Sequence, residues 1–169
     1  MGVTPLEGLI MGTRSGDIDP GIFDFICDHE GISVKEMNTV LNKKSGVMAL
    51  SNNLSSDFRD LEEAMNNGNE AAALAIDAFS YRVAKYIGSY TAAMNGVDAI
   101  AFTGGIGENA GIVRKKVCEY LGFLGITIDP EQNKKRGEAI VLTTADSKVK
   151  AIVMPTNEEL AICRETVRL

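Results

Sequence analysis

Hydrophobic residues recur along most of this chain every three or four positions, which is the spacing of helices with one apolar face. The longest such pattern extends from Glu70 to Met94, with Asn69 as its cap and Asn95-Gly96 at its end. We predict that the apolar stripe of this helix faces a core. The stripe consists of Phe79, Val83, Tyr86, Ile87, Tyr90 and Met94.

Sequence signals at helix starts predict the other helices. Thr4 and Glu7 form a capping box for a short helix that reaches about Met11, and Ser33 and Glu36 form a second box. Further helices are predicted from Asp19-Pro20, from Asp57, directly after residues 103–109, from Pro130, and from Thr156, where Thr156 and Glu159 form a third capping box.

Short apolar runs between some of these helices predict strands. They are Ala99–Phe102, Ile126–Ile128, Ile140–Thr143 and Lys150–Met154. No internal repeat, low-complexity segment or flexible linker divides the sequence, so we predict one domain over residues 1–169. With 45% hydrophobic residues, this domain can bury a core.

The run Ala99–Phe102 ends at a glycine-rich turn, TGGIGEN over residues 103–109, and a helical pattern follows at once. The start of a helix leaves backbone N–H groups without partners, and the helix dipole makes that end positive. Glycine lets a ligand approach the backbone closely and permits a positive φ. We therefore predict that this turn binds phosphate.

Two other interpretations of the turn stay open on its sequence alone. One is an ordinary connection between a strand and a helix. The other is a dinucleotide-binding fingerprint, with Gly105, Gly107 and Ala110 at the required spacing and Asp129 about 20 residues further on. Against the fingerprint, the sequence shows one clear βαβ unit here, and Glu108 occupies the place where a pyrophosphate would lie.

A loop near the start of the chain carries a candidate ligand-binding arginine. Arg14 lies between Gly12 and Gly16, among small residues. A guanidinium held there can offer its planar fork to a phosphoryl or carboxylate group. The alternative is an internal ion pair with Asp17 or Asp19, and the spacing does not choose between the two.

Two helix starts carry further candidates. Asp57 fits a helix cap and Arg59 a solvated charge, but Phe58, between these polar residues, can cover a flat ligand. Glu158 follows the last predicted strand and is not needed by the capping box. Its carboxylate is favoured at a helix start by the dipole, or it holds Mg²⁺ directly or through water.

Composition narrows the class of protein. A net charge of −6 without a block of Lys or Arg argues against nucleic acid as a partner. We expect no membrane association and a cytoplasmic location, because no apolar run reaches the length of a membrane span and no signal-peptide pattern is present. The three cysteines lack C-x-x-C spacing, so we predict reduced thiols, with Cys118 and Cys163 packed in helices. His29, the single histidine, is expected to be solvated.

Five blocks of the sequence together resemble the acetate kinase family, within the superfamily of actin-like ATPases and sugar kinases. The blocks are MGVTPLEGLIMGTRSGDIDP, NKKSG, SSDFRDLEEA, FTGGIGENAGIVR and IVMPTNEELAI. Their order and spacing also fit the family, and the resemblance covers essentially the whole chain. It implies an α/β fold, the C-terminal lobe of an actin-like ATPase (ribonuclease H-like) fold, in which helices pack on a small mixed sheet. It argues against the dinucleotide interpretation.

The resemblance also implies a reaction and residue roles. Family members transfer the γ-phosphoryl group of ATP to acetate, with Mg²⁺, and form acetyl phosphate and ADP. By resemblance, Arg14 stabilises the transferring phosphoryl group and Glu158 is the Mg²⁺ carboxylate. The nucleotide-binding residues that it implies are Asp57, Phe58, Arg59, Gly105, Ile106, Gly107, Glu108 and Asn109.

The chain departs from the family in length, since family members are much longer. By resemblance it is a C-terminal piece, and the rest supplies a catalytic Asp, a substrate-pocket Arg and an active-site His that His29 does not replace. We therefore expect the piece alone to be inactive, with acetate or acetyl phosphate bound only together with the N-terminal lobe. The resemblance implies a homodimer. A propionate or butyrate kinase, or a module that only binds nucleotide or dimerises, is the alternative.

Overall fold

The computed structural model describes residues 2–168. Where the sequence predicts one domain, the structure has two compact units, Met1–Ser89 and Tyr90–Leu169. The long helix α5, Glu70–Ala93, begins in the first unit and ends in the second. No helix among the described residues is long and apolar enough to cross a membrane.

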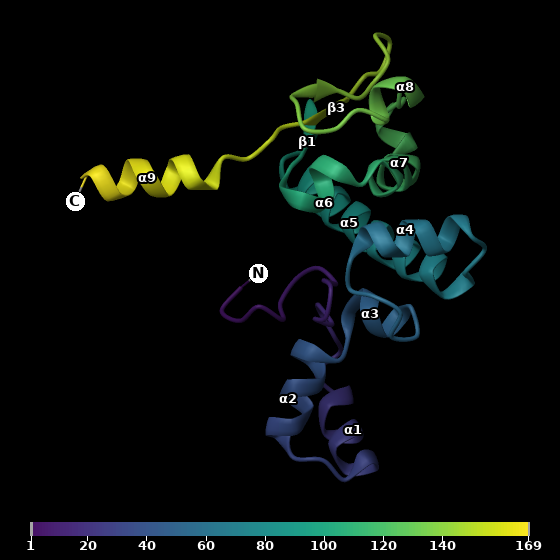
Figure 1. The fold of residues 1–169 in the computed structure, drawn as a ribbon, viewed down its shortest axis with the longest axis vertical. Helices are drawn as coiled ribbons and strands as arrows, with labels where there is room; N and C mark the ends of the chain where they lie inside the picture. The colour runs from purple at the N-terminus through teal and green to yellow at the C-terminus, as the bar shows by residue number, and fades with distance from the viewer. Residues whose placement is uncertain (1, 169) are drawn as a thin grey trace. The chain divides into compact units, whose positions relative to one another are not determined.

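The first unit consists of helices and loops within its described residues. Its helices are α1 (Ile22–Glu30), α2 (Val34–Lys43), α3 (Gly46–Leu50), α4 (Phe58–Asn66) and most of α5 (Figure 1). Apolar side chains of α2 to α5 form its core; they include Met37, Leu41, Val47, Phe58, Leu61, Ala72, Ile76 and Phe79. The predicted helices from residue 19 onward are therefore confirmed in this unit.

Local capping explains where several of these helices begin. The predicted box at Ser33 is present: the Ser33 N–H donates to Glu36 Oε2 over 2.8 Å, and the Glu36 N–H donates to Ser33 Oγ over 3.3 Å. Asn69 caps α5, because its Oδ1 accepts the N–H of Ala72 over 2.9 Å. Gly31 ends α1 at φ +64°, a conformation that favours glycine.

The predicted helix at Thr4–Met11 is wrong, because this segment is a series of bends. The Gly8 N–H donates to Asp17 Oδ1 over 2.7 Å, and the Asp17 N–H donates to the Gly8 carbonyl over 3.0 Å. Asp17 also accepts from Arg82 over 2.8 Å and from the Tyr86 hydroxyl, both on α5. Long-range hydrogen bonds through Asp17 thus take the backbone groups that a local helix would have used.

The buried face of α5 differs from the predicted stripe. It consists mainly of small side chains: Ala72, Ala75, Ile76, Phe79, Ser80 and Ala84. Of the predicted stripe only Phe79 is buried, whereas Tyr90 and Met94 are 60% and 62% exposed. The last buried position is Ala84, so the stripe prediction fails toward the C-terminal end of the helix.

Phe58 belongs to the core of the first unit. Its ring is 8% exposed and meets the ring of Phe79 edge to face, with 4.7 Å between the ring centroids. Such pairs add stabilisation beyond the apolar area that they bury. The interpretation of Phe58 as a cover for a flat ligand is therefore wrong for its ring.

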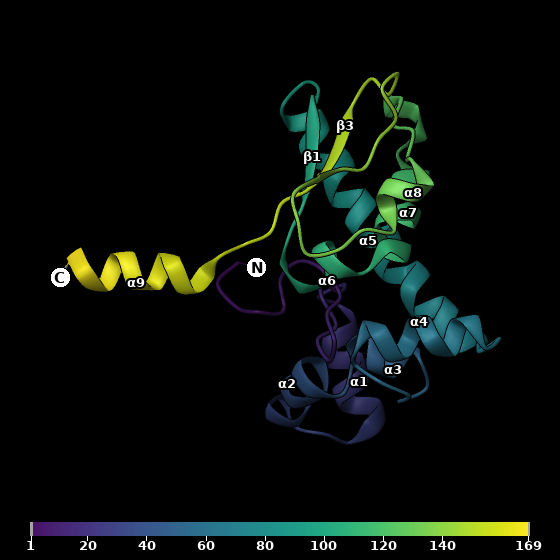
Figure 2. The same ribbon diagram turned by 45° about the horizontal axis from the view of Figure 1, so that its top comes forward.

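The second unit contains a small mixed sheet. Strand β3 (Lys150–Val153) lies between β1 (Ala99–Phe102), to which it is parallel, and β2 (Ile140–Val141), to which it is antiparallel. Figure 2 shows β1 and β3 side by side. The predicted strand Ile126–Ile128 is reduced to one bridge, between Ile128 and Thr143. One parallel pair beside an antiparallel strand is not a doubly wound sheet, which agrees with rejecting the dinucleotide fingerprint.

Helices and one 3₁₀ turn accompany this sheet. They are α6 (Gly104–Asn109), α7 (Gly111–Tyr120), η1 (Gly122–Leu124), α8 (Pro130–Asn133) and α9 (Glu158–Arg168). The third capping box is wrong: Asn157, not Thr156, caps α9, because Asn157 Oδ1 accepts the N–H of Leu160 over 2.9 Å. No residue of α9 is buried.

Cysteine and histidine positions test the remaining predictions on packing. Cys118 is buried on α7, as predicted, and burial raises the pKa of its thiol to about 12. Cys163 is exposed on α9, so the prediction that it is packed is wrong. His29 is exposed, as predicted, and stacks on the ring of Phe25.

We predict that Phe58→Ala lowers the free energy of unfolding by about 3–4 kcal/mol, because it removes one ring of a buried pair and leaves a cavity. Urea denaturation followed by circular dichroism measures the loss. Phe25→Ala is the matched control, since this ring is exposed on α1. Equal losses in the two variants would contradict the core position of Phe58.

Candidate functional site

The predicted glycine turn is helical. Strand β1 ends at Phe102, Thr103 is extended, and α6 begins at Gly104 with φ +68°. The first N–H groups of such a helix have no intrahelical partners and point outward at its start. The turn therefore offers backbone donors to an anion, but from a short helix and not from a loop.

The three glycines of α6 serve different purposes. Gly104 has a positive φ that other residues adopt with strain. Gly107 packs on the sheet, since a Cβ there would lie 3.0 Å from the carbonyl carbon of Phe102. At Gly105 an added Cβ would meet no atom within 4 Å apart from its chain neighbours and the backbone of its own helix, and its φ is not positive. Nothing in the described fold requires glycine at Gly105, so its bare backbone faces free space.

Arg114, on α7, anchors the C-terminal end of α6. Its side chain is fully buried, and its Nη1 donates to the carbonyl oxygens of Gly107 and Glu108 over 3.0 and 2.8 Å. The other donors reach Asn133 Oδ1 over 2.9 Å and the carbonyl oxygens of Asn133 and Lys135 over 2.6 and 3.2 Å. A cation at the negative end of a helix dipole is favourable, and hydrogen bonds offset the cost of burying its charge.

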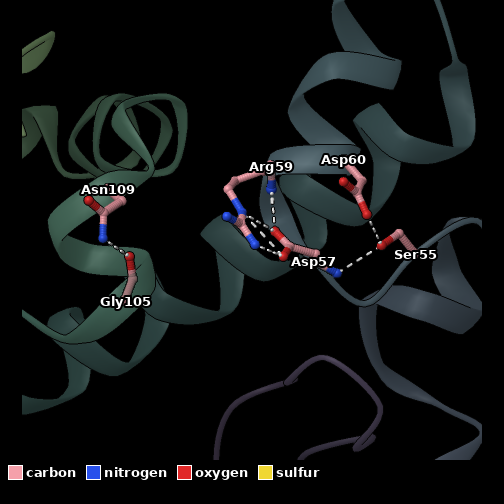
Figure 3. A network of polar contacts seen from close by, with 6 residues as sticks. All are labelled: Ser55, Asp57, Arg59, Asp60, Gly105 and Asn109. Atoms are coloured by element: carbon pink, nitrogen blue, oxygen red, sulfur yellow. Dashed lines mark hydrogen bonds and ion pairs between the residues drawn. The ribbon is translucent and has the colours of Figure 1, made fainter.

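Two side chains of α6 make contacts of their own. Asn109 Nδ2 donates to the Gly105 carbonyl over 2.9 Å, which Figure 3 shows as a dashed line along the helix. The Glu108 side chain binds a residue outside α6: its Oε1 accepts from the N–H and the hydroxyl of Thr156, over 3.0 and 3.2 Å. Glu108 thus links α6 to the segment just before Glu158.

In the first unit, Asp57 and Arg59 bind each other. Asp57 caps α4, because its Oδ1 accepts the Arg59 N–H over 2.8 Å. The Arg59 guanidinium also forms an ion pair with this carboxylate, with Nη2 and Oδ2 2.6 Å apart (Figure 3). Ser55 holds the preceding turn: its Oγ accepts the Asp57 N–H over 3.0 Å and donates to Asp60 over 2.7 Å. The interpretation of Asp57 as a cap is confirmed. Its carboxylate is engaged by Arg59.

Arg14 is not paired with a carboxylate in the part of the chain that the structure describes. Its one recorded side-chain contact is 3.9 Å from Nη1 to the sulfur of Met11, and Asp17 binds Arg82 and Tyr86 instead. Arg14 lines an open groove of about 480 Å³, together with Thr13, Lys35, Asn38, Thr39, Asn42 and Lys43. Three of these described lining residues are cationic and none is acidic, so the groove suits an anion.

Glu158 is the first residue of α9 and is exposed. Its carboxylate has no recorded ion-pair or hydrogen-bond partner within residues 2–168, and no group of three or more His, Cys, Asp or Glu there surrounds a metal position. Mg²⁺ usually takes one or two carboxylates and completes its shell with phosphate and water oxygens. Glu158 is therefore a single exposed carboxylate, without a cage of protein ligands among the described residues.

Comparison with known proteins identifies the family of this chain. Residues 1–164 match the model of the acetokinase family. The chain belongs to that family. It is 65% identical to the acetate kinase of Agathobacter rectalis over 170 residues, which cover 100% of this chain and 43% of the relative.

Solved structures of this family share the fold. The crystal structure of Porphyromonas gingivalis acetate kinase matches 98% of this chain and 41% of its own, with a TM-score of 0.91 and 48% identity. A propionate kinase from Francisella tularensis matches 98% of this chain and 42% of its own, with a TM-score of 0.90 and 44% identity. The chain thus spans less than half of the length of these acetokinase relatives, and the predicted small mixed sheet packed by helices is confirmed.

Within each unit, the structure shows which predicted site residues of this acetokinase chain meet. In the second, Gly105, Ile106, Gly107, Glu108 and Asn109 share α6, and Glu108 reaches the segment that leads to Glu158. In the first, the Asp57–Arg59 pair and Arg14 lie in separate segments.

Sequence reasoning missed two residues that hold α6, Arg114 and Thr156. Arg114 lies three positions before the buried Val117, on the apolar face of α7, and a charged residue on such a face is a usable signal. Thr156 is predicted as a cap, but nothing in the sequence indicates that it holds α6, because its partner Glu108 is 48 positions away.

The ion pair with Arg59 should set how Asp57 titrates. Hydrogen bonds from the Arg59 side chain and then its backbone N–H lower the pKa of Asp57 to about 2. The Asp57 carboxyl thus has a lower pKa in the folded chain than in the unfolded chain. Its contacts with Arg59 therefore stabilise the fold above a pH of about 4, and this stabilisation is lost as the pH falls toward about 2.

We predict that Arg59→Ala raises the Asp57 pKa toward about 3.9, its usual value. Carboxyl NMR titration measures this, and Arg82→Ala, whose guanidinium binds Asp17, should leave Asp57 unchanged. An unchanged Asp57 pKa in Arg59→Ala would contradict the assignment.

Proposed function

We propose that this chain supplies the nucleotide-binding part of an acetate kinase, which transfers the γ-phosphoryl group of ATP to acetate and releases ADP and acetyl phosphate. The observation that carries the proposal is the open N-terminal turn of α6: at Gly105 the fold leaves bare backbone facing free space. The identity of 65% with an acetate kinase along the whole chain supports the reaction class.

The phosphates would bind at the start of α6. Backbone N–H groups from Gly105 and Ile106 and the positive end of the helix suit phosphate oxygens, and a glycine lets them approach. Gly107 and Asn109 act through the fold, by packing on β1 and by holding the Gly105 carbonyl. Asp57 and Arg59 are proposed beside the adenosine, with Phe58 contributing through its backbone because its ring is buried.

Arg14 and Glu158 are proposed to serve the phosphoryl group itself. Arg14 has no carboxylate partner among the described residues, so its guanidinium is available for the charge of the transferring group. Glu158 would hold Mg²⁺, which neutralises phosphate charge when bound. Phosphoryl transfer depends mainly on such positioning and charge neutralisation, so both residues fit the reaction without forming covalent bonds.

We propose acetate as the carboxylate that accepts the phosphoryl group. The Francisella tularensis propionate kinase has the same fold with a TM-score of 0.90, so the fold does not separate acetate from propionate. The identity of 65% to the Agathobacter rectalis acetate kinase, against 44% to this propionate kinase, favours acetate. A homodimer, a cytoplasmic location and a role of the isolated chain as a nucleotide-binding or dimerising module are proposed on the same resemblance.

Binding of ADP by the 169-residue chain tests the proposed site. We predict weak binding that Gly105→Val abolishes, because the branched side chain fills the free space over the α6 backbone. Gly122→Val is the matched control, since Gly122 also has free space around it but lies in η1. Arg14→Ala should bind ADP like the wild type, because Arg14 is assigned to the transferred group.

Calorimetry with ADP measures these affinities, and circular dichroism confirms that each variant is folded. Absence of heat with folded wild type at millimolar ADP would contradict a nucleotide site in this chain. Wild-type affinity in a folded Gly105→Val variant would exclude α6 as the phosphate site.

We also predict that the chain alone forms no acetyl phosphate from ATP, acetate and Mg²⁺ above a blank. It spans 43% of the length of the Agathobacter rectalis enzyme, and by resemblance a catalytic Asp, Arg and His belong to the remainder. Loss of even one charge-stabilising group costs about 10²–10³ in rate. The Agathobacter rectalis enzyme, assayed in parallel, is the positive control, and acetyl phosphate formed by the chain above the blank, free of host enzyme, would refute the prediction.

A further inference from the structure

Glu108 is an unexpected residue in a turn that is proposed to bind phosphate, because a carboxylate repels phosphate oxygens. In the structure this carboxylate is already engaged. Its Oε1 accepts the backbone N–H of Thr156 over 3.0 Å and the Thr156 hydroxyl over 3.2 Å. Hydrogen bonds to an ionised carboxylate are stronger than neutral ones, so this contact is a directed link between α6 and Thr156.

The link fixes the segment that leads to Glu158. Strand β3 ends at Val153, and the next N–H, of Met154, donates to the Phe102 carbonyl over 2.9 Å. Thr156 is then held by Glu108, and α9 begins at Glu158. Both anchors adjoin α6, since Phe102 precedes it and Glu108 belongs to it.

Packing does not hold Glu158 in place, because no residue of α9 is buried. The direction in which the chain leaves β3 is then set by hydrogen bonds along residues 154–157. Of these, only the two from Thr156 to Glu108 join this segment to α6 itself among the bonds recorded for residues 2–168.

We propose that Glu108 is a positioning residue, which holds Thr156 and thereby sets the Glu158 carboxylate for Mg²⁺ on a nucleotide bound at α6. This replaces a direct contact between Glu108 and the nucleotide, and it rests on the proposed function. Groups that orient a metal ligand typically change metal affinity about 10–100-fold when they are removed.

Two variants distinguish loss of the hydrogen-bond acceptor at Glu108 from loss of its negative charge. Glu108→Ala removes the acceptor, whereas Glu108→Gln keeps an oxygen for Thr156. Glu159→Ala is the matched control, because Glu159 is the neighbouring exposed carboxylate on α9. Each is made in the 169-residue chain.

The first measurement needs no ligand. Hydrogen exchange of the Thr156 amide, followed by NMR, should accelerate about tenfold or more in Glu108→Ala, since its acceptor is lost. It should stay near the wild-type rate in Glu108→Gln and Glu159→Ala. Unchanged exchange in Glu108→Ala would overturn the link.

The second measurement is ADP affinity with and without Mg²⁺, by calorimetry. In Glu108→Ala the Mg²⁺ affinity of the ADP-bound chain should fall about tenfold, and it should also fall in Glu158→Gln, while ADP affinity without Mg²⁺ stays at the wild-type value. A loss of ADP affinity without Mg²⁺ would overturn the proposal, since it would mean that Glu108 contacts the nucleotide. If wild type binds no ADP, the proposed function fails and Thr156 exchange alone decides on the link.

Discussion

The guanidinium of Arg114, fully buried at the C-terminal end of α6, holds together the part of the second unit that carries the candidate site. A helix of six residues is too short to be stable by itself. Arg114 donates hydrogen bonds to the carbonyl groups at the end of α6. The same guanidinium also donates to the carbonyl oxygens of Asn133 and Lys135, so it links α6 to that segment. Gly111 makes this approach possible, because a Cβ there would lie 2.9 Å from the Asn133 carbonyl oxygen.

Two other contacts complete the support of α6. Gly107 packs against the end of β1 at Phe102, and Glu108 binds Thr156 beyond the end of β3. The helix is thus held at its C-terminal end, on its inner side and through one side chain, while its N-terminal turn stays open at Gly105. A rigid support with one open end is what a binding site made of backbone donors requires.

Sequence signals predicted the helix starts that depend on hydrogen bonds between neighbouring residues. Ser33, Asp57 and Asn69 cap helices as their spacing indicates, because a cap involves only the next three residues. The same signal failed at Thr4 and Thr156. There, hydrogen bonds to distant residues prevail, from Gly8 to Asp17 and from Thr156 to Glu108. Local patterns cannot reveal a partner that the fold supplies.

In the candidate site, too, the sequence identified residues but did not identify all of their contacts. Its residues were found from sequence and resemblance, but several contacts were not. Phe58 is a core ring, Asp57 and Arg59 pair with each other, and Glu108 faces Thr156. The Asp57–Arg59 pair is local, and the spacing permitted it without choosing it over a ligand contact. The surroundings of Phe58 and Glu108 depend on residues distant in the chain, Phe79 and Thr156, which local spacing does not reveal.

The different surroundings of the α6 glycines bear on how this segment can evolve. Selection for folding alone would act against side chains at Gly107 and Gly111, where a Cβ meets backbone at 3.0 and 2.9 Å, and would accept them at Gly105. Any constancy of Gly105 among working enzymes would then come from a pressure other than the folding of this segment, such as a bound ligand. A library of variants screened once for folding and once for catalysis would separate these two pressures within a stretch of seven residues, Gly105 to Gly111.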